Sequence, residues 1–188
     1  MGSELMLTTV VTILLAFIGY IVTYLNNLRL SQRAERLERV NRQLGELYGP
    51  MFALTNAGDT IWRAFRSVYR PEYKAYFGEG DPPTDEELAA WRLWMSTVFM
   101  PINSRLYELI LSKMDLLIEK EIPPVILDFF AHVAAYQVVL EQWRNGDFSE
   151  HVSLINYPSS ISDYAYNSFK ALKDEQEKLL GIKKKKHI

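Results

Sequence analysis

The sequence predicts an all-α protein with a single N-terminal transmembrane helix that continues into a juxtamembrane neck helix, followed by a cytoplasmic bundle of four or five helices. Three observations predict this fold. Residues 5–25 carry no charge, the later segments repeat apolar residues every three or four positions, and no segment alternates apolar and polar residues as an amphipathic strand does. The predicted divisions are an anchor at 1–25, a neck at 26–48, a helical domain at 49–182 and a polybasic tail at 183–188.

The uncharged run has the length of a membrane span. Its twenty-one residues would extend about 31 Å as a helix, which is close to the thickness of the hydrocarbon layer. A cleaved signal peptide would instead begin with basic residues and end in small ones. The opening "MGSELM" has no Lys or Arg, and the run is followed by "NNLR". We therefore predict a retained membrane anchor, with the lipid bilayer as its first partner.

Basic residues next to the run predict its orientation. Five arginines and two glutamates lie within residues 26–42, whereas no basic residue precedes the run. Positive residues close to a span stay on the cytoplasmic side, so the N-terminus is predicted outside and the rest of the chain in the cytoplasm. Basic side chains in the neck and the tail are predicted to meet anionic headgroups, namely Arg29, Arg33, Arg36, Lys183, Lys184, Lys185 and Lys186.

The remaining composition excludes several functions. The formal net charge is −2, and residues 43–182 contain twelve basic and twenty acidic side chains. Broad binding of this region to nucleic acid is excluded, because phosphate contacts need clustered basic residues. The absence of cysteine excludes disulfides, thiolate metal sites and iron–sulfur clusters. No catalytic, metal or cofactor motif is recognised, so we expect no cofactor.

Two seams run along the anchor and the neck. Small residues at spacings of four, three and four predict a membrane-helix packing face, formed by Thr12, Ala16, Gly19 and Thr23. Heptad spacing continues in the neck, at Leu30, Ala34, Leu37, Asn41, Leu44 and Tyr48. Three interpretations of the neck seam remain open: packing on the protein's own body, a parallel pair with a second copy, or packing along another subunit's helix.

The boundaries of the later helices follow from local signals. Gly49-Pro50 predicts the end of the neck, because Gly suits a helix end and Pro suits the first turn of the next helix, which extends to Tyr69. Thr84 and Glu87 form a capping box that begins another helix. Pro101 lies inside that helix and predicts a kink or a split. Two further helices are expected from about Pro124 to Arg144 and from Ser159 or Ser160 to Gly181.

A line of basic residues at helical spacing follows the neck. Arg63, Arg66 and Arg70, with Lys74 beyond them, could hold a phosphate or an acidic partner segment through charge-assisted hydrogen bonds. The alternative is a solvated face that pairs with the acidic residues of the body.

A second candidate site is the pair of Asp128 and His132. These residues are four apart on one helix and could act as an acid–base pair or share a metal. His132 also belongs to an apolar stripe, so a core histidine hydrogen-bonded to a neighbour is the expected role.

These observations favour a non-enzymatic, single-span membrane protein that acts as an accessory subunit, scaffold or adaptor. Its expected partner is another membrane subunit or a second copy of itself, contacted through helices. An alternative function is a membrane-anchored sensor or effector that binds an anionic ligand through Arg63, Arg66 and Arg70. A weaker alternative is a membrane-surface enzyme that uses Asp128 and His132.

Overall fold

The computed structural model describes residues 2–71, 76–77 and 82–182, and the regular elements in this part of the chain are all helical. The α-helices are α1 (Gly2–Arg42), α2 (Gly49–Tyr69), α3 (Asp85–Trp94), α4 (Met100–Ser112), α5 (Pro124–Arg144) and α6 (Ser160–Leu180). Two short segments with the wide turns of a π-helix are η1 (Gln43–Tyr48) and η2 (Met95–Phe99), and one 3₁₀ turn is η3 (Met114–Leu116). The predicted all-α class is confirmed. Two compact units divide the chain, Met1–Asn41 with Glu175–Ile188 and Arg42–Asp174.

The first unit contains α1 up to Asn41 and the end of α6. Side-chain hydrogen bonds join the two helices in antiparallel order, with Arg33 opposite Leu179 and Arg36 opposite Glu175. The end of α6 is closed by Gly181, which has a φ of 73°. Its N–H donates to the carbonyl of Lys178, and the next N–H donates to the carbonyl of Glu177. This pair of bonds is the Schellman motif, which satisfies the last carbonyls of a helix.

The predicted boundary at Gly49-Pro50 is where α2 begins, but no break separates it from the neck, because helical turns continue from Gly2 to Tyr69. The N–H of Gly49 donates to the carbonyl of Leu44, five residues earlier. A proline ring clashes with the carbonyl four residues before it in a regular helix. The wider turns of η1, immediately before Pro50, relieve that conflict. The neck and the first helix of the body are therefore one continuous helix.

The same geometry accommodates Pro101. The N–H of Met100 donates to the carbonyl of Met95, again five residues earlier. Helical structure therefore extends from Asp85 to Ser112 through η2. The expected interruption at Pro101 takes the form of a wide turn. The predicted capping box at the start of this segment is confirmed, with Thr84 and Glu87 bonded reciprocally.

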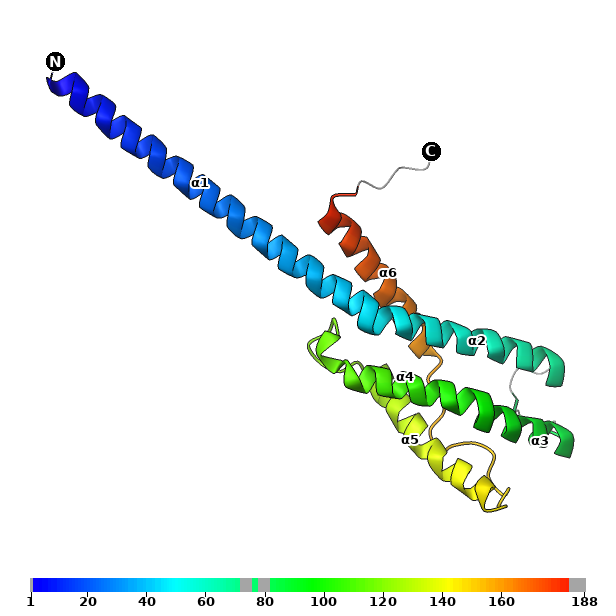
Figure 1. Cartoon of the computed structure of the whole chain (residues 1–188). Coiled ribbons are helices and arrows are strands. Elements are labelled where there is room, and N and C mark those ends of the chain that lie inside the picture. The colour runs from blue at the N-terminus through cyan, green and yellow to red at the C-terminus, as the bar shows by residue number, and fades with distance from the viewer. Residues whose placement is uncertain (1, 72–75, 78–81, 183–188) are drawn as a thin grey trace, which may run out of the picture. The chain divides into compact units, whose positions relative to one another are not determined.

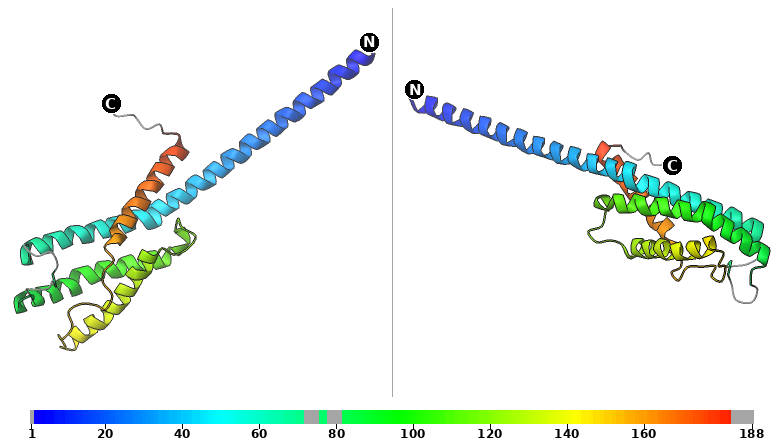
Figure 2. Two further views of the ribbon diagram at one scale, coloured as in Figure 1. Left: turned by 180° about the vertical axis from the view of Figure 1, so that it is seen from behind. Right: turned by 60° about the horizontal axis from the view of Figure 1, so that its bottom comes forward.

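The second unit packs its helices in layers. Within this unit α4 lies between α2 and α5, as Figures 1 and 2 show. Phe65 of α2 is buried at the centre of an aromatic cluster in this unit. Its ring contacts those of Trp62, Tyr69, Tyr76, Trp91, Trp94 and Phe99. The buried positions of α3, η2 and α4 include Trp91, Met95, Phe99, Leu106 and Ile110, which follow the apolar repeat of three or four residues.

Candidate functional site

The N-terminal part of α1 exposes apolar side chains on every face. Residues at successive positions are exposed, so no single side of the helix is polar. The large ones between Met6 and Leu25 are Met6, Leu7, Val10, Val11, Ile13, Leu14, Leu15, Phe17, Ile18, Tyr20, Ile21, Val22, Tyr24 and Leu25. Helix α1 is thus long and apolar enough to cross a membrane. Helix α5 also meets that criterion, but much of its surface is buried in the core of the second unit.

Three threonine hydroxyls of this segment are bonded within the helix itself. The hydroxyls of Thr8, Thr12 and Thr23 donate to the carbonyls four residues earlier, at distances of 3.0, 2.8 and 2.8 Å. A bilayer interior offers no hydrogen bonds, so a spanning segment must satisfy its polar groups internally. Tyr20 and Tyr24 stack with ring centroids 6.5 Å apart at the end of the segment nearest Arg29. Tyrosines are enriched at that level of a membrane span.

The predicted small-residue face is open in this chain. Thr12, Ala16, Gly19 and Thr23 are all exposed. A Cβ atom added at Gly19 would meet no atom within 4 Å. The described part of the chain therefore leaves this face available to another helix.

The predicted neck seam is divided between solvent, α6 and the body. Leu30 and Ala34 are exposed and Leu37 is half-buried. The amide oxygen of Asn41 accepts a hydrogen bond of 2.6 Å from Gln176. Leu44 and Tyr48 are buried within the second unit. Of the three interpretations, packing on the protein's own body describes Leu44 and Tyr48, whereas the interpretations that involve a partner helix stay predictions for the exposed Leu30 and Ala34.

The predicted membrane-surface arginines have different environments. Arg36 makes two hydrogen bonds to the carboxylate of Glu175, at 2.6 and 3.0 Å. Arg33 donates through Nε to the carbonyl of Leu179 at 2.7 Å. Arg29 is exposed. The predicted membrane-surface lysines, Lys183, Lys184, Lys185 and Lys186, lie outside the described residues. Lys74 of the predicted basic line also lies outside them.

The structure separates the predicted basic line into exposed and buried members. Arg63 is exposed and donates to the hydroxyl of Thr60, and Arg66 lies 5.7 Å from the ring centroid of Trp62. Arg70 is different, because its side chain is only 1% exposed and pairs with Glu87 at 2.8 Å. The prediction of a continuous anion-binding surface through Arg70 is corrected, since this guanidinium lies in the interior.

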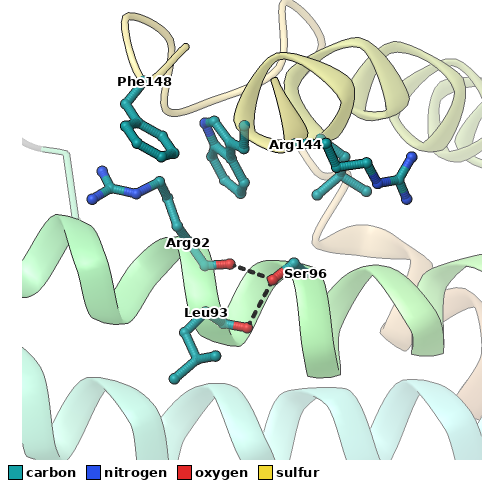
Figure 3. A pocket seen from close by; sticks show the side chains of 7 residues that line it. Arg92, Leu93, Ser96, Arg144 and Phe148 are labelled. Carbon is teal, nitrogen blue, oxygen red and sulfur yellow. Dashed lines mark hydrogen bonds between the residues drawn. The ribbon is translucent and has the colours of Figure 1, made fainter. Parts of the chain in front are cut away.

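A pocket of about 260 Å³ lies between α3 and α5 in the second unit. Figure 3 shows Arg92 beside Phe148, with Arg144 elsewhere on the pocket wall. The guanidinium carbon of Arg92 lies 4.4 Å from the ring centroid of Phe148. Apolar walls with a cation at the edge could receive an apolar group that carries a carboxylate. Sequence reasoning did not find this pocket, because Arg92 and Arg144 are far apart in the chain and share no motif.

His132 is a buried core histidine, which was its expected role. Its Nδ1 lies 2.7 Å from the carbonyl oxygen of Ile155, so the neutral ring must carry its proton on Nδ1 to donate this bond. Three further side chains bond the carbonyls of the same connection between α5 and α6: Trp91, Tyr136 and Trp143. Asp128 is exposed on α5. The histidine thus fixes the connection to the body and lies away from solvent.

Stability should depend on pH through His132. Burial lowers the pKa of His132 below its ordinary value of 6.5, and the bond to Ile155 opposes this shift only in part. The unfolded chain therefore binds the proton more readily, so stability falls as the pH decreases below about 6.5. Burial and Arg92 also lower the pKa of His151, so both histidines contribute to the pH dependence of the wild-type free energy of unfolding. We expect His132→Asn, which keeps a side-chain N–H donor, to reduce the slope of the free energy of unfolding against pH. Denaturant titrations at several pH values measure this slope. An unchanged slope would contradict this assignment.

No group of three or more His, Cys, Asp or Glu residues that could hold a metal ion occurs in the described ranges. No protein-family model matches the chain, and comparisons with curated proteins and solved structures found no match.

Proposed function

We propose that this chain is a single-span membrane protein whose helical body acts as a non-enzymatic accessory subunit, scaffold or adaptor. The observation that supports the proposal most strongly is the exposed apolar surface of α1 between Met6 and Leu25. Each large apolar side chain left in water forgoes roughly 1.5–3 kcal/mol of burial free energy. More than ten such side chains together amount to on the order of 20 kcal/mol, which exceeds the stability of a typical domain. A hydrocarbon environment removes this cost.

The proposed orientation places the N-terminus outside and the domain in the cytoplasm. Its support is the asymmetry of basic residues around the apolar segment, with Arg29 as the first of five on the C-terminal side. The chain contains no cysteine, so a single introduced thiol reports one position. We expect a cysteine at Ser3 to react with a membrane-impermeant thiol reagent on intact cells, and a cysteine at Ser149 to react only after permeabilisation. The opposite labelling pattern would contradict the proposed topology.

The proposed mode of action is helix association within the membrane. The face formed by Thr12, Ala16, Gly19 and Thr23 has small side chains, and the described chain does not cover it. The hydroxyls of Thr12 and Thr23 bond their own helix, so their methyl groups can pack closely against a neighbouring backbone. Small faces of this type permit two membrane helices to approach.

The test of this association is Gly19→Ile. The added side chain meets no atom of the described chain, so the body should remain folded. At a helix contact, however, it would separate the two backbones and weaken association by about 1–2 kcal/mol. The measurement is crosslinking in membranes together with mass photometry in mild detergent. A matched control is Val10→Ile, because Val10 lies on the opposite side of the helix from Gly19 and also gains bulk.

Two results would contradict the helix-association proposal. The wild-type protein could be strictly monomeric with no co-purifying chain. Alternatively, the variants at Gly19 and Val10 could weaken association equally, which would show that added bulk has no preferred face. An effect at Gly19 alone would identify the small-residue face as the contact.

A further inference from the structure

We propose that the pocket between α3 and α5 docks a short segment of a partner protein in which an aromatic residue is followed by an acidic one. The aromatic ring enters the pocket, and the carboxylate meets the guanidinium of Arg92 at its edge. The inference rests on the proposed role as an accessory subunit, scaffold or adaptor, and it adds the chemistry of one partner that the body recognises.

The first step is the apolar character of the pocket. Leu140 and Trp143 of α5 line it and are buried in the second unit. Leu93 of α3 and Phe148 also line it, and they are exposed to 60% and 49%. Covering large apolar side chains that are left in water is favourable. An apolar group that enters the pocket therefore gains contacts with buried side chains and also removes exposed ones from solvent.

The second step is that the neutral polar groups of the pocket already have partners. The indole N–H of Trp143 donates to the carbonyl of Glu150 at 2.8 Å. The hydroxyl of Ser96 donates to the carbonyl of Arg92 at 2.7 Å, as Figure 3 shows. A ligand that covers these two side chains leaves no hydrogen bond unmade. An aromatic ring, which offers none, is therefore suited to this wall.

The third step is the charge of Arg92. Its guanidinium carbon lies 4.4 Å from the ring centroid of Phe148, and a guanidinium above a ring keeps its N–H donors in its own plane. No salt bridge joins Arg92 to a carboxylate in the described part of the chain, whereas Arg144 pairs with Glu141 at 3.0 Å. Arg92 thus supplies a cation that an incoming anion can neutralise.

The chemistry of a single guanidinium favours a carboxylate as that anion. The two oxygens of a carboxylate accept two parallel N–H bonds from one guanidinium. A phosphorylated side chain carries up to two negative charges and is typically recognised by a cluster of arginines. The other basic residue of the pocket, Arg144, already has a carboxylate partner in Glu141. The pocket therefore matches an aspartate or a glutamate.

The fourth step is size. The pocket has a volume of about 260 Å³, and sites for whole drug-sized ligands occupy roughly 300–1,000 Å³. A cavity of roughly 150 Å³ is enough for benzene, so one aromatic side chain fits. Because Leu93 and Phe148 at its wall are exposed, the pocket is open to a side chain that enters from a continuing polypeptide. Aromatic side chains seated in such pockets supply much of the binding energy at protein interfaces.

The experiment uses the full chain in mild detergent with Ser96→Cys, which places its only thiol on the pocket wall. The probes are end-blocked tetrapeptides, cysteine–glycine–phenylalanine–aspartate and the same peptide with asparagine in place of aspartate. Disulfide exchange at fixed reductant and intact-mass spectrometry give the fraction of the chain that carries each peptide. We expect the aspartate peptide to be favoured about tenfold, as for a hydrogen bond to a charged group. Glycine in place of phenylalanine should remove most of this advantage.

The matched control places the thiol at Ser67→Cys on α2. Ser67 is exposed, and its hydroxyl donates to the carbonyl of Ala64 in its own helix. The exposed Arg63 precedes Ser67 by four residues, as Arg92 precedes Ser96. Any preference for aspartate that comes merely from a neighbouring arginine on a helix would therefore appear at both positions. We expect the aspartate and asparagine peptides to exchange equally at position 67.

Two variants of Arg92 test its part in the recognition. In the chain with the thiol at position 96, Arg92→Gln should abolish the preference for the aspartate peptide. Arg92→Lys keeps the charge but loses the planar fork, so a preference of about threefold should remain. Equal midpoints of denaturant unfolding for the three chains show that the pocket is intact in each.

The outcomes separate this inference from the proposed function. Equal exchange of the two peptides at position 96, the same preference at position 67, or an unchanged preference in Arg92→Gln overturns the docking site. Greater retention of a phosphotyrosine peptide than of the aspartate peptide overturns carboxylate recognition. A wild-type chain with no co-purifying partner contradicts the adaptor function, whereas the full preference at position 96 would still support the recognition chemistry.

Discussion

Arg70→Met is expected to lower the free energy of unfolding by about 3 kcal/mol, because it leaves Glu87 without its buried cationic partner. The side chain of Arg70 is 1% exposed and that of Glu87 is 21% exposed. Partial access of Glu87 to solvent places the expected cost at the lower end of the range for broken buried pairs. The guanidinium also lies 5.7 Å from the ring centroid of Tyr76, so the substitution removes an aromatic contact as well.

The measurement is denaturant unfolding of the detergent-solubilised chain, followed by tryptophan fluorescence. Trp62, Trp91 and Trp94 all contact the aromatic cluster in which Phe65 is central, so their emission reports on the second unit. The control is Arg63→Met, seven residues earlier and inside α2. Arg63 is exposed, and its replacement should change stability by less than about 0.5 kcal/mol. Equal effects of the two substitutions would contradict the structural distinction between them.

This prediction also affects any test of anion binding. Loss of ligand or partner binding in an Arg70 variant could arise from unfolding of the second unit. Arg63 and Arg66 are therefore the informative positions for the alternative sensor function. Unchanged partner recovery with Arg66→Glu, in a folded protein, would remove the support for that alternative.

Gly49→Ala is expected to lower the free energy of unfolding by about 2–3 kcal/mol, as for overpacking of a filled site. A Cβ at Gly49 would lie 2.5 Å from the carbonyl oxygen of Leu44. That carbonyl belongs to the wide turn that accommodates Pro50, and it already accepts the N–H of Gly49. Backbone atoms cannot move away as the end of a flexible side chain can, so the turn itself must distort.

The control is Gly58→Ala, in the middle of α2. A Cβ at Gly58 would meet no atom within 4 Å. Alanine is favoured over glycine inside a helix, so this substitution should raise stability by about 0.5–1 kcal/mol. Helix propensity alone predicts that both substitutions stabilise the protein. Opposite signs in the same unfolding assay would confirm the wide turn, and two stabilising substitutions would contradict it.

Local signals allowed several elements of the fold to be predicted. Thr84 and Glu87 predict the start of α3 because a capping box satisfies backbone groups within four residues. The bounds of α5, Pro124 and Arg144, follow from a proline at the first turn and a glycine just beyond the end. The apolar face of α3, η2 and α4 follows from periodicity. Each of these features depends on residues close together in the sequence.

Local signals did not show that helical turns continue past Gly49-Pro50. Gly49-Pro50 is a common helix boundary, and a regular helix would be interrupted there. Whether the chain continues through a wide turn depends on packing. Leu44, Leu47 and Tyr48 are buried within the second unit, and this burial stabilises a helical path across the proline. A sequence pattern that counts only neighbouring residues does not contain that contribution.

The sequence by itself determined the all-α class, the uncharged apolar segment and the basic residues that follow it, because composition and helical period are local properties. Only the tertiary structure decided which charged residues are available to a partner. Arg63 and Arg70 both belong to the predicted basic line, yet one is exposed on α2 and the other, just past the end of α2, is buried against Glu87. Arg36 is likewise committed to Glu175, which is distant in the sequence. The physical reason is that the charge of a side chain is set by its residue type, whereas its solvation and its partners are set by whichever distant segment packs against it.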